Sequence, residues 1–285
     1  MLLFSLLKPM KENDLPPKKI IQGQAPSWWK YIQEVIHYRG LLYTLIVRDF
    51  KVRYAQTSLG LLWVFIQPIT SLLIFSLVFG IAIKVDTGGI PYPVFAFSGL
   101  YAWSYFSTVV NQGGASILNA QGLVTKIYFP RIILPLSKAL VATIELLISI
   151  VLMIGVMWWY HYIPSVNLVY FPLWLLALLL ASLGCAIGLS ALSVRFRDFQ
   201  PISRFGLQVG FYLTPIAYPS SLIPVRYQVI YYCNPMAGIT EGFRWMITGG
   251  ELSPYVGISV GVACVIILLS SWYFRKTERV LADIV

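Results

Sequence analysis

The stretch Val47–Pro68, VRDFKVRYAQTSLGLLWVFIQP, decides how the rest of the chain is interpreted. Its first residues carry a dense set of charges at Arg48, Asp49, Lys51 and Arg53. No Asp, Glu, Lys or Arg then occurs from Tyr54 to Ile83. An uncharged apolar stretch of this length can cross a bilayer, and a basic segment before it is typical of the cytoplasmic side. We therefore expect the first membrane helix to begin here.

The composition extends this interpretation to the whole chain. Of the 285 residues, 58% are hydrophobic and only 11% are charged, whereas a soluble domain carries about 25% charged residues. The apolar runs are continuous rather than alternating, so the spans are expected to be helices and not the strands of a barrel. The sequence therefore predicts an all-α integral membrane protein.

The positions of the uncharged runs predict six membrane spans, at residues 58–83, 94–117, 135–159, 169–194, 205–218 and 254–274. The transmembrane domain would occupy residues 58–285. Cytoplasmic or interfacial amphipathic helices would precede it in residues 27–57, after a poorly ordered segment, residues 1–26. Between spans five and six, a moderately apolar stretch is broken at Asn234-Pro235, which predicts two short re-entrant helices on the periplasmic side.

The first helix after the Pro-rich start is expected to be amphipathic. Ser27 is a candidate N-cap, and apolar residues then recur at helical spacing: Trp28, Trp29, Ile32, Val35 and Ile36. The helix is too short and too polar to span a bilayer, and its Trp pair suits the membrane interface. Packing of the same face against a soluble partner is the alternative interpretation.

The distribution of Lys and Arg predicts the orientation in the membrane. With six spans both termini lie on one side, and of the 21 Lys and Arg residues only Lys84, Arg226 and Arg244 lie on the other. The positive-inside rule makes the basic side cytoplasmic. We therefore expect a multi-pass protein of the inner membrane with both termini in the cytoplasm. The net charge of +10 then reflects topology and contact with membrane lipids rather than binding of nucleic acid.

The sequence contains no pattern that indicates an enzyme. It lacks the GxxxxGK[ST] phosphate-binding loop, the HExxH zinc motif and the GxSxG nucleophile motif. The two histidines are expected on opposite sides of the membrane, and the three cysteines are widely separated. We expect no catalytic residue, no metal site and no cofactor in this chain.

Glu145 is the acidic residue placed well inside an expected span. An ionisable group at membrane depth is a functional candidate. A structural carboxylate that is hydrogen-bonded to Thr143, to Ser149 or to a neighbouring helix is the alternative. A proton-coupled transporter normally needs more such groups, which weakens a secondary-transport interpretation.

Aromatic residues form two groups in the expected spans. The first is Tyr101, Trp103, Tyr105 and Phe106, and the second is Phe211, Tyr212 and Tyr218. Most aromatic residues in membrane proteins pack or lie at the interface. Flat apolar rings also stack on the C–H faces of sugars, so an aromatic path for a neutral or weakly charged glycan is the functional alternative.

Several motifs in order along the chain resemble those of the permease subunits of polysaccharide-exporting ABC transporters, which export O-antigen (the glycan part of lipopolysaccharide), capsule or teichoic acid. They are the opening stretch Arg48–Gly60 with Trp63 and Gln67-Pro68; Phe97–Leu100 with Trp103; Lys126–Arg131; Phe196–Asp198; Thr214–Ile216; Tyr218-Pro219; Asn234–Met236; and Glu241–Arg244. Each motif is weak alone, but their order and spacing together are specific. The similarity runs from about residue 39 to the end of the chain.

The resemblance implies a homodimer of six-span subunits bound to two copies of a separate ATPase subunit, which would bind ATP and Mg. It implies transport of a lipid-linked polysaccharide across the membrane. It also implies ATPase contacts at cytoplasmic residues: Arg48, Asp49, Lys51, Arg53, Tyr54, Lys126, Arg131, Arg197 and Asp198. Asn234, Pro235, Glu241 and Arg244 would belong to a periplasmic gate.

Two other classes of function remain as alternatives at this stage. One is a secondary transporter or a lipid-linked oligosaccharide flippase that uses an ion gradient. The other is a membrane-bound glycosyl or acyl transferase, for which the sequence offers no acid–base cluster facing one compartment.

Overall fold

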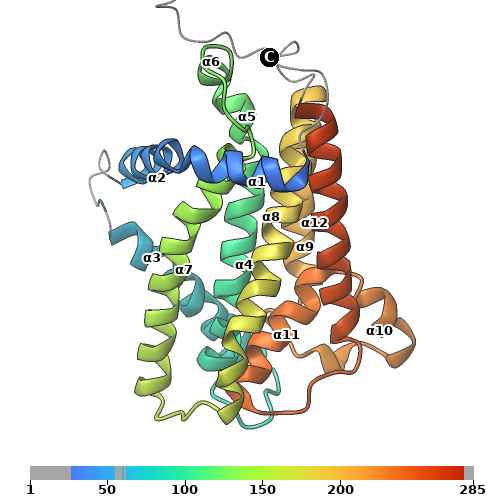
Figure 1. The fold of residues 1–285 in the computed structure, drawn as a ribbon. Helices are drawn as coiled ribbons and strands as arrows, with labels where there is room; N and C mark the ends of the chain where they lie inside the picture. The colour runs from blue at the N-terminus through green and yellow to red at the C-terminus, as the bar shows by residue number, and fades with distance from the viewer. Residues whose placement is uncertain (1–26, 55–59, 61, 279–285) are drawn as a thin grey trace, which may run out of the picture.

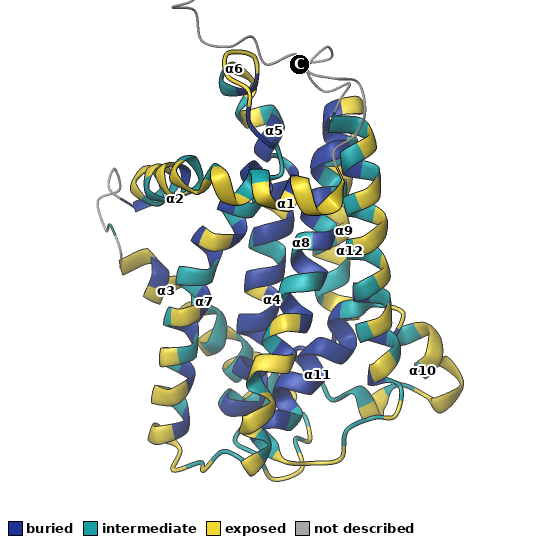
Figure 2. Cartoon of the chain, viewed as in Figure 1, coloured by how far each residue is buried: buried dark blue, intermediate teal, exposed yellow. Residues whose placement is uncertain are grey.

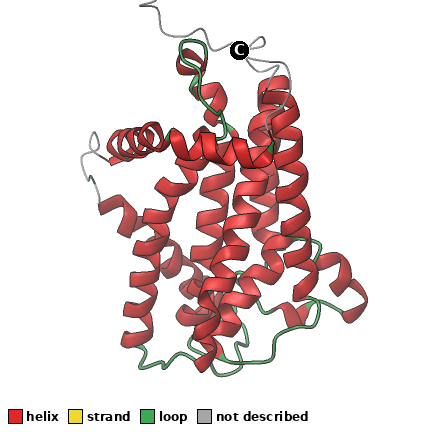
Figure 3. Ribbon diagram, in the orientation of Figure 1, coloured by secondary structure: helices red, strands yellow, loops and turns green. Residues whose placement is uncertain are grey.

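The computed structural model describes residues 27–54, residue 60 and residues 62–278. Helices and their connections make up this part of the chain, which contains no strand (Figure 3). The expectation of an all-helical protein is confirmed. The expected poorly ordered segment, residues 1–26, lies outside the described residues.

Two helices lie across one end of an upright bundle (Figure 1). They are α1 (Trp28–His37) and α2 (Arg39–Tyr54), and two short helices, α5 (Ser116–Asn119) and α6 (Gln121–Val124), lie at the same end. Ser27 caps α1 as expected, since its Oγ accepts a hydrogen bond from the Lys30 backbone N–H at 3.4 Å. Trp28 and Trp29 are exposed. These apolar side chains support a position of α1 at the membrane interface, which stays a prediction.

The central helix of the bundle is α4 (Tyr92–Gly114). It packs against helices on several sides, namely α3 (Leu62–Phe75), α7 (Ile133–Trp159), α8 (Phe171–Arg195), α9 (Phe199–Leu213) and α11 (Pro235–Thr248). Most of its residues are buried, which Figure 2 shows as a dark column at the centre of the bundle. The last helix, α12 (Val256–Glu278), packs along α8.

Four helical segments are long and apolar enough to cross a membrane: Leu62–Ala82, Ile133–Trp159, Val166–Arg195 and Val256–Glu278. The first consists of α3 and a π-helical continuation, η2 (Ser76–Ala82), and the third includes a 3₁₀ turn, η3 (Val166–Tyr170). Each coincides with an expected span. The protein is therefore a multi-pass membrane protein.

The other two expected spans correspond to α4 and α9. Neighbouring helices bury most residues of α4, so polar residues such as Ser98 can lie away from lipid, whereas Ser104 and Asn111 are exposed. The fifth span was expected at residues 205–218, and this boundary is wrong, because α9 begins at Phe199 and ends at Leu213. Pro201 is tolerated in the first turn of α9, whereas Pro215 prevents its continuation. Six spans remain a prediction.

The connection between α9 and α12 lies toward the end of the bundle opposite α1 and α2 (Figure 1). It contains η4 (Ser220–Leu222), α10 (Val225–Tyr231) and the buried α11. The break at Asn234-Pro235 is confirmed, since the Asn234 side chain caps α11 by accepting from the Met236 N–H at 3.0 Å. Re-entry of these helices into the membrane stays a prediction.

Helices α8 and α12 approach each other closely at two glycines of α8. A Cβ atom added at Gly184 would lie 2.9 Å from the backbone nitrogen of Ile267, and one added at Gly188 would lie 2.5 Å from the Ser270 Oγ. The pair has the small-xxx-small spacing that lets membrane helices pack backbone to backbone. Gly184 meets main chain, which cannot rotate away as a side chain can.

Replacing Gly184 with Ala is expected to destabilise the protein by about 1–3 kcal/mol, because the added methyl group separates α8 from α12. Thermal unfolding of the purified chain in detergent measures this as a lower Tm. Gly261→Ala in α12 is the matched control, since a Cβ there meets nothing within 4 Å. Equal Tm values for the two variants would show that the close approach is not needed.

Candidate functional site

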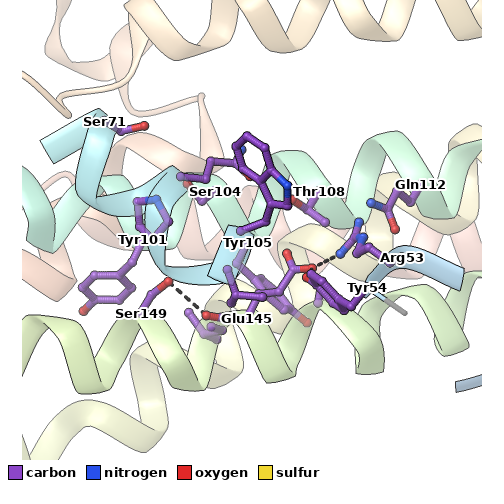
Figure 4. A pocket seen from close by; sticks show the side chains of 16 residues that line it. Arg53, Tyr54, Ser71, Tyr101, Ser104, Tyr105, Thr108, Gln112, Glu145 and Ser149 are labelled. Carbon is purple, nitrogen blue, oxygen red and sulfur yellow. Dashed lines mark hydrogen bonds and ion pairs between the residues drawn. The ribbon is translucent and has the colours of Figure 1, made fainter. Parts of the chain in front are cut away.

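A cavity of about 410 Å³ lies between α3, α4 and α7, next to the C-terminal end of α2. Figure 4 shows its wall from close by. The lining residues come from these four helices: Arg53, Tyr54, Trp63, Val64, Gln67, Pro68, Ser71, Tyr101, Ser104, Tyr105, Thr108, Gln112, Ala142, Glu145, Leu146 and Ser149. Its volume lies within the range of about 300–1,000 Å³ that is common for small-ligand pockets.

The wall of this cavity is polar although three expected membrane spans form it. Hydroxyl and amide side chains predominate, and Pro68 in α3 leaves the Val64 carbonyl without its usual helical donor. Non-helical or unsatisfied backbone at membrane depth is tolerated where it lines a cavity. The cavity can therefore hold water or a ligand rich in hydroxyl groups.

Glu145 of α7 lies in this wall and is paired with the end of α2. Its carboxylate accepts from the Arg53 guanidinium in an ion pair (Figure 4) and from the Tyr54 hydroxyl at 2.5 Å. Both charged side chains are about one quarter exposed, at 25% and 26%. Burial lowers the pKa of Arg53 from its usual high value, and the remaining basicity keeps the group protonated at neutral pH.

The Glu145 carboxylate is thus held by a neighbouring helix, which is one of the structural alternatives that the sequence left open. The Ser149 hydroxyl bonds the Glu145 backbone oxygen and not its carboxylate. The neighbour that holds the carboxylate is α2, the helix whose residues were expected to contact an ATPase.

A second ion pair joins the same two helices. Lys138 of α7 lies 2.6 Å from Asp49 of α2, and Asp49 also pairs with Arg48 at 2.8 Å. On α7, Lys138 precedes Glu145 by two turns. On α2, the order of charges is opposite, since Asp49 precedes Arg53 by one turn. We call the four residues Asp49, Arg53, Lys138 and Glu145 the α2–α7 charge cluster. This opposite order of charges fixes the direction in which α2 crosses α7, because a reversed α2 would bring like charges together.

The remaining residues expected to contact an ATPase fall into two groups. Lys51, Lys126, Arg197 and Asp198 are exposed, and the Arg48 side chain is half exposed. Arg131 is used internally, since its backbone N–H and its guanidinium donate to Glu278 at the end of α12. Glu278 also accepts from the Tyr31 hydroxyl at 2.9 Å, so α1, the loop before α7 and α12 are tied together.

The aromatic residues expected to form one glycan path occupy three places. Tyr101 and Tyr105 line the cavity. Trp103 and Phe106 are buried and pack together, and Trp103 contacts Phe211 of α9 at a ring distance of 5.8 Å. Tyr212 is exposed, and the Tyr218 hydroxyl bonds its backbone oxygen.

Among the residues expected at a periplasmic gate, Glu241 and Arg244 are buried, and Asn234 and Pro235 are partly buried. Arg244 Nη2 donates to the backbone oxygens of Pro215 and Ile216 at 2.6 and 3.1 Å. Glu241 accepts from the Tyr232 hydroxyl, and the Asn234 amide donates to the Thr214 Oγ1 at 3.0 Å. Together with Pro235, which begins α11, these residues hold the segment after α9 against α11.

Sequence reasoning missed most of the cavity wall. Gln67, Ser71, Ser104, Thr108 and Gln112 lie on the cavity side of α3 and α4, but polar residues in a span point to a cavity only once the facing helices are known. Sequence reasoning also missed the pairing of Lys138 with Asp49. The opposite order of charges on the two helices could have indicated this contact. Among the described residues, no group of three or more His, Cys, Asp or Glu could hold a metal ion.

The α2–α7 charge cluster makes a prediction about stability. Lys138→Glu is expected to lower the free energy of unfolding by about 2 kcal/mol, because it sets two carboxylates against each other in a partly buried position. For a chain of this size this is about 4–8 °C in Tm.

The control for this variant is Lys51→Glu, which makes the same charge change on an exposed face of α2. The double variant Asp49→Lys/Lys138→Glu restores opposite charges and is expected to recover part of the loss. A Tm for the double variant that is no higher than for Lys138→Glu would contradict the pairing.

Comparison with known proteins places the chain in a family. Residues 40–248 match the ABC-2 type transporter family. The chain is 32% identical to the O-antigen export system permease protein RfbA of Myxococcus xanthus, over 75% of this chain and 83% of the relative. It is 30% identical to an O-antigen export system permease protein RfbA of Klebsiella pneumoniae, over 86% and 96%, and 27% identical to the polysialic acid transport protein KpsM of Escherichia coli, over 75% and 84%. The chain belongs to the ABC-2 type transporter family.

Proposed function

We propose that this chain is the membrane subunit of an ATP-driven exporter in the inner membrane. It moves a lipid-linked, O-antigen-like polysaccharide from the cytoplasm to the outer side. Two copies of the chain assemble with two ATPase subunits, which bind ATP and Mg. The chain itself transports and makes no bonds, and the relatives named for O-antigen and polysialic acid export support this assignment.

The observation that carries the proposal is the polar cavity at the end of α2. Tyr101 and Tyr105 supply aromatic surface, and the surrounding hydroxyl and amide groups can exchange hydrogen bonds with sugar hydroxyls. The Arg53–Glu145 pair leaves this part of the wall without net charge. Such a lining suits a neutral glycan better than an ion.

The α2–α7 charge cluster supplies the connection between this cavity and an ATPase. Helix α2 presents Lys51 and the half-exposed Arg48 on its outer face, and the cluster attaches its opposite face to α7. A movement of α2 that a bound ATPase imposes is therefore passed to α7, which forms one wall of the cavity. In this proposal the ATPase lies on the cytoplasmic side of the membrane, together with α1, α2 and both termini.

The homodimer is supported by the surface of α9. None of its residues is buried, and Gln208 is among the exposed ones. A glutamine that faces lipid leaves its amide without hydrogen-bond partners. A second copy of the chain covering α9 and the adjacent α3, which touch through Phe75 and Phe211 at 5.7 Å, removes this cost.

An ion-gradient transporter or a flippase without an ATPase is the competing function. It needs an acidic group that is free to take up and release a proton. Glu145 is held by Arg53 and Tyr54, so its carboxylate is not a free acidic group of this kind. ATP-driven transport is therefore the better-supported proposal.

Reconstitution into proteoliposomes tests the ATPase requirement. We expect ATP-dependent movement of lipid-linked polysaccharide only when the ATPase subunit is present. Lys51→Glu is expected to reduce ATP hydrolysis stimulated by the permease by about tenfold, because this charge lies on the exposed face of α2. Lys30→Glu on exposed α1 is the matched control. Transport by the permease alone, driven by an ion gradient, would contradict the proposal.

Filling the cavity tests whether the glycan uses it. Ser104→Trp adds a large side chain to an exposed position of the wall and is expected to lower the amount of cell-surface polysaccharide at least fivefold. Leu147→Trp, which adds bulk on the outward face of α7, is the control for expression and insertion. Normal surface polysaccharide in the Ser104→Trp variant, at equal protein levels, would exclude this cavity from the path.

A further inference from the structure

A second cavity, of about 460 Å³, lies among the connections at the end of the bundle opposite α1 and α2. Four separate parts of the chain form its wall: the loop 86–88, Phe95 of α4, the linker 219–221, and α11 with the loop that follows it. The sequence motif Glu241–Arg244 lies in this wall. The cavity shares no lining residue with the one beside α2.

Arg244 is the buried donor of this second cavity, with 7% of its surface exposed. Its guanidinium carbon lies 3.7 Å from the centre of the Phe95 ring, and its Nη2 is bound by two backbone oxygens. Its Nε has no hydrogen-bond partner among the described residues. A buried charged donor that lacks an acceptor is costly, so the site has donor capacity that the described protein atoms do not use.

The same wall contains acceptors. Glu241 is buried, and its carboxylate accepts from the Tyr232 hydroxyl and from the Ser253 N–H at 3.4 Å. Asp86 and Glu251 are exposed at the cavity. The hydroxyl groups of Ser220, Ser221 and Thr248 line it as well, and a hydroxyl both donates and accepts.

This mixture of charges selects among classes of ligand. A phosphate or another anion would approach three carboxylates, and a metal cation would meet the Arg244 guanidinium, so each faces like charge in part of the wall. A neutral ligand with several hydroxyl groups can donate to the carboxylates and accept from the guanidinium. Trp245 adds a partly exposed ring on which an apolar face of such a ligand can pack.

We propose that this second cavity binds an uncharged sugar unit. The volume is within the range for a small ligand, and the cavity lies at the far end of the bundle from α2. Under the proposed function, on which this assignment of the sugar rests, the site holds a unit of the glycan after it has passed the membrane.

Saturation-transfer NMR on the full chain in lipid nanodiscs tests the proposal. The probes are uncharged trisaccharides of mannose, galactose or rhamnose, with inorganic phosphate and Ca²⁺ as competitors. Wild-type chain is expected to transfer saturation to at least one trisaccharide, and neither competitor is expected to reduce it.

Gly250→Trp tests the location of the site. Gly250 lines the cavity, and a Cβ atom added there meets nothing within 4 Å. Made in the Ser104→Trp background, in which the first cavity is filled, Gly250→Trp is expected to lower the signal at least fivefold. Gly257→Trp adds the same bulk at an exposed position outside the lining, also with open space, and is expected to keep the signal.

The outcomes separate this proposal from the proposed function. Absence of transfer from every trisaccharide, displacement by phosphate or Ca²⁺, or equal signals from the Ser104→Trp variant with and without Gly250→Trp would each overturn the sugar site. ATP-dependent export is measured on the same wild-type preparation with its ATPase. Export without sugar binding would contradict only the sugar site. Sugar binding without export would contradict only the proposed function.

Discussion

A carboxylate within a membrane helix is costly unless a cation neutralises it, and in this chain the cation comes from a helix that lies across the end of the bundle. Glu145 of α7 is paired with Arg53 of α2, and Lys138, two turns earlier on α7, is paired with Asp49. A surface helix would gain little from exposed ion pairs, but these are partly buried. The position of α2, and the closure of the cavity beside it, both depend on this cluster.

The two cavities lie at different ends of the bundle and differ in chemistry. The one beside α2 combines an internally neutralised ion pair with hydroxyl, amide and Tyr side chains. The other combines buried Arg244 with carboxylates. Helix α4 contributes to both, and neighbouring helices bury most of its residues. Polar groups that can bind a ligand therefore lie at both ends of the bundle.

The fold class and most helix boundaries were predictable, because uncharged runs and the residues Ser27 and Asn234 act locally. The expected fifth span, in contrast, ran past Pro215, where the helix has already ended. Tyr101 and Tyr105 were also identified as candidates, although Trp103 from the same group packs against α9. The cavity wall was not predictable, since it depends on which faces of α3, α4 and α7 meet. Glu145 was recognised as unusual, but its partner lies about 90 residues away in sequence, and no local pattern reveals such a contact.

The central claim is that the α2–α7 charge cluster makes these two helices move together when a bound ATPase acts on α2. Spin labels at Val52 of α2 and Leu147 of α7, both exposed, measure the distance between them with and without ATP in the assembled transporter. A second pair, Leu147 with exposed Leu73 of α3, reports on the cavity. The account predicts that ATP leaves the distance from Val52 to Leu147 unchanged and changes the distance from Leu147 to Leu73. A change in the distance from Val52 to Leu147 with a constant distance from Leu147 to Leu73 would contradict it.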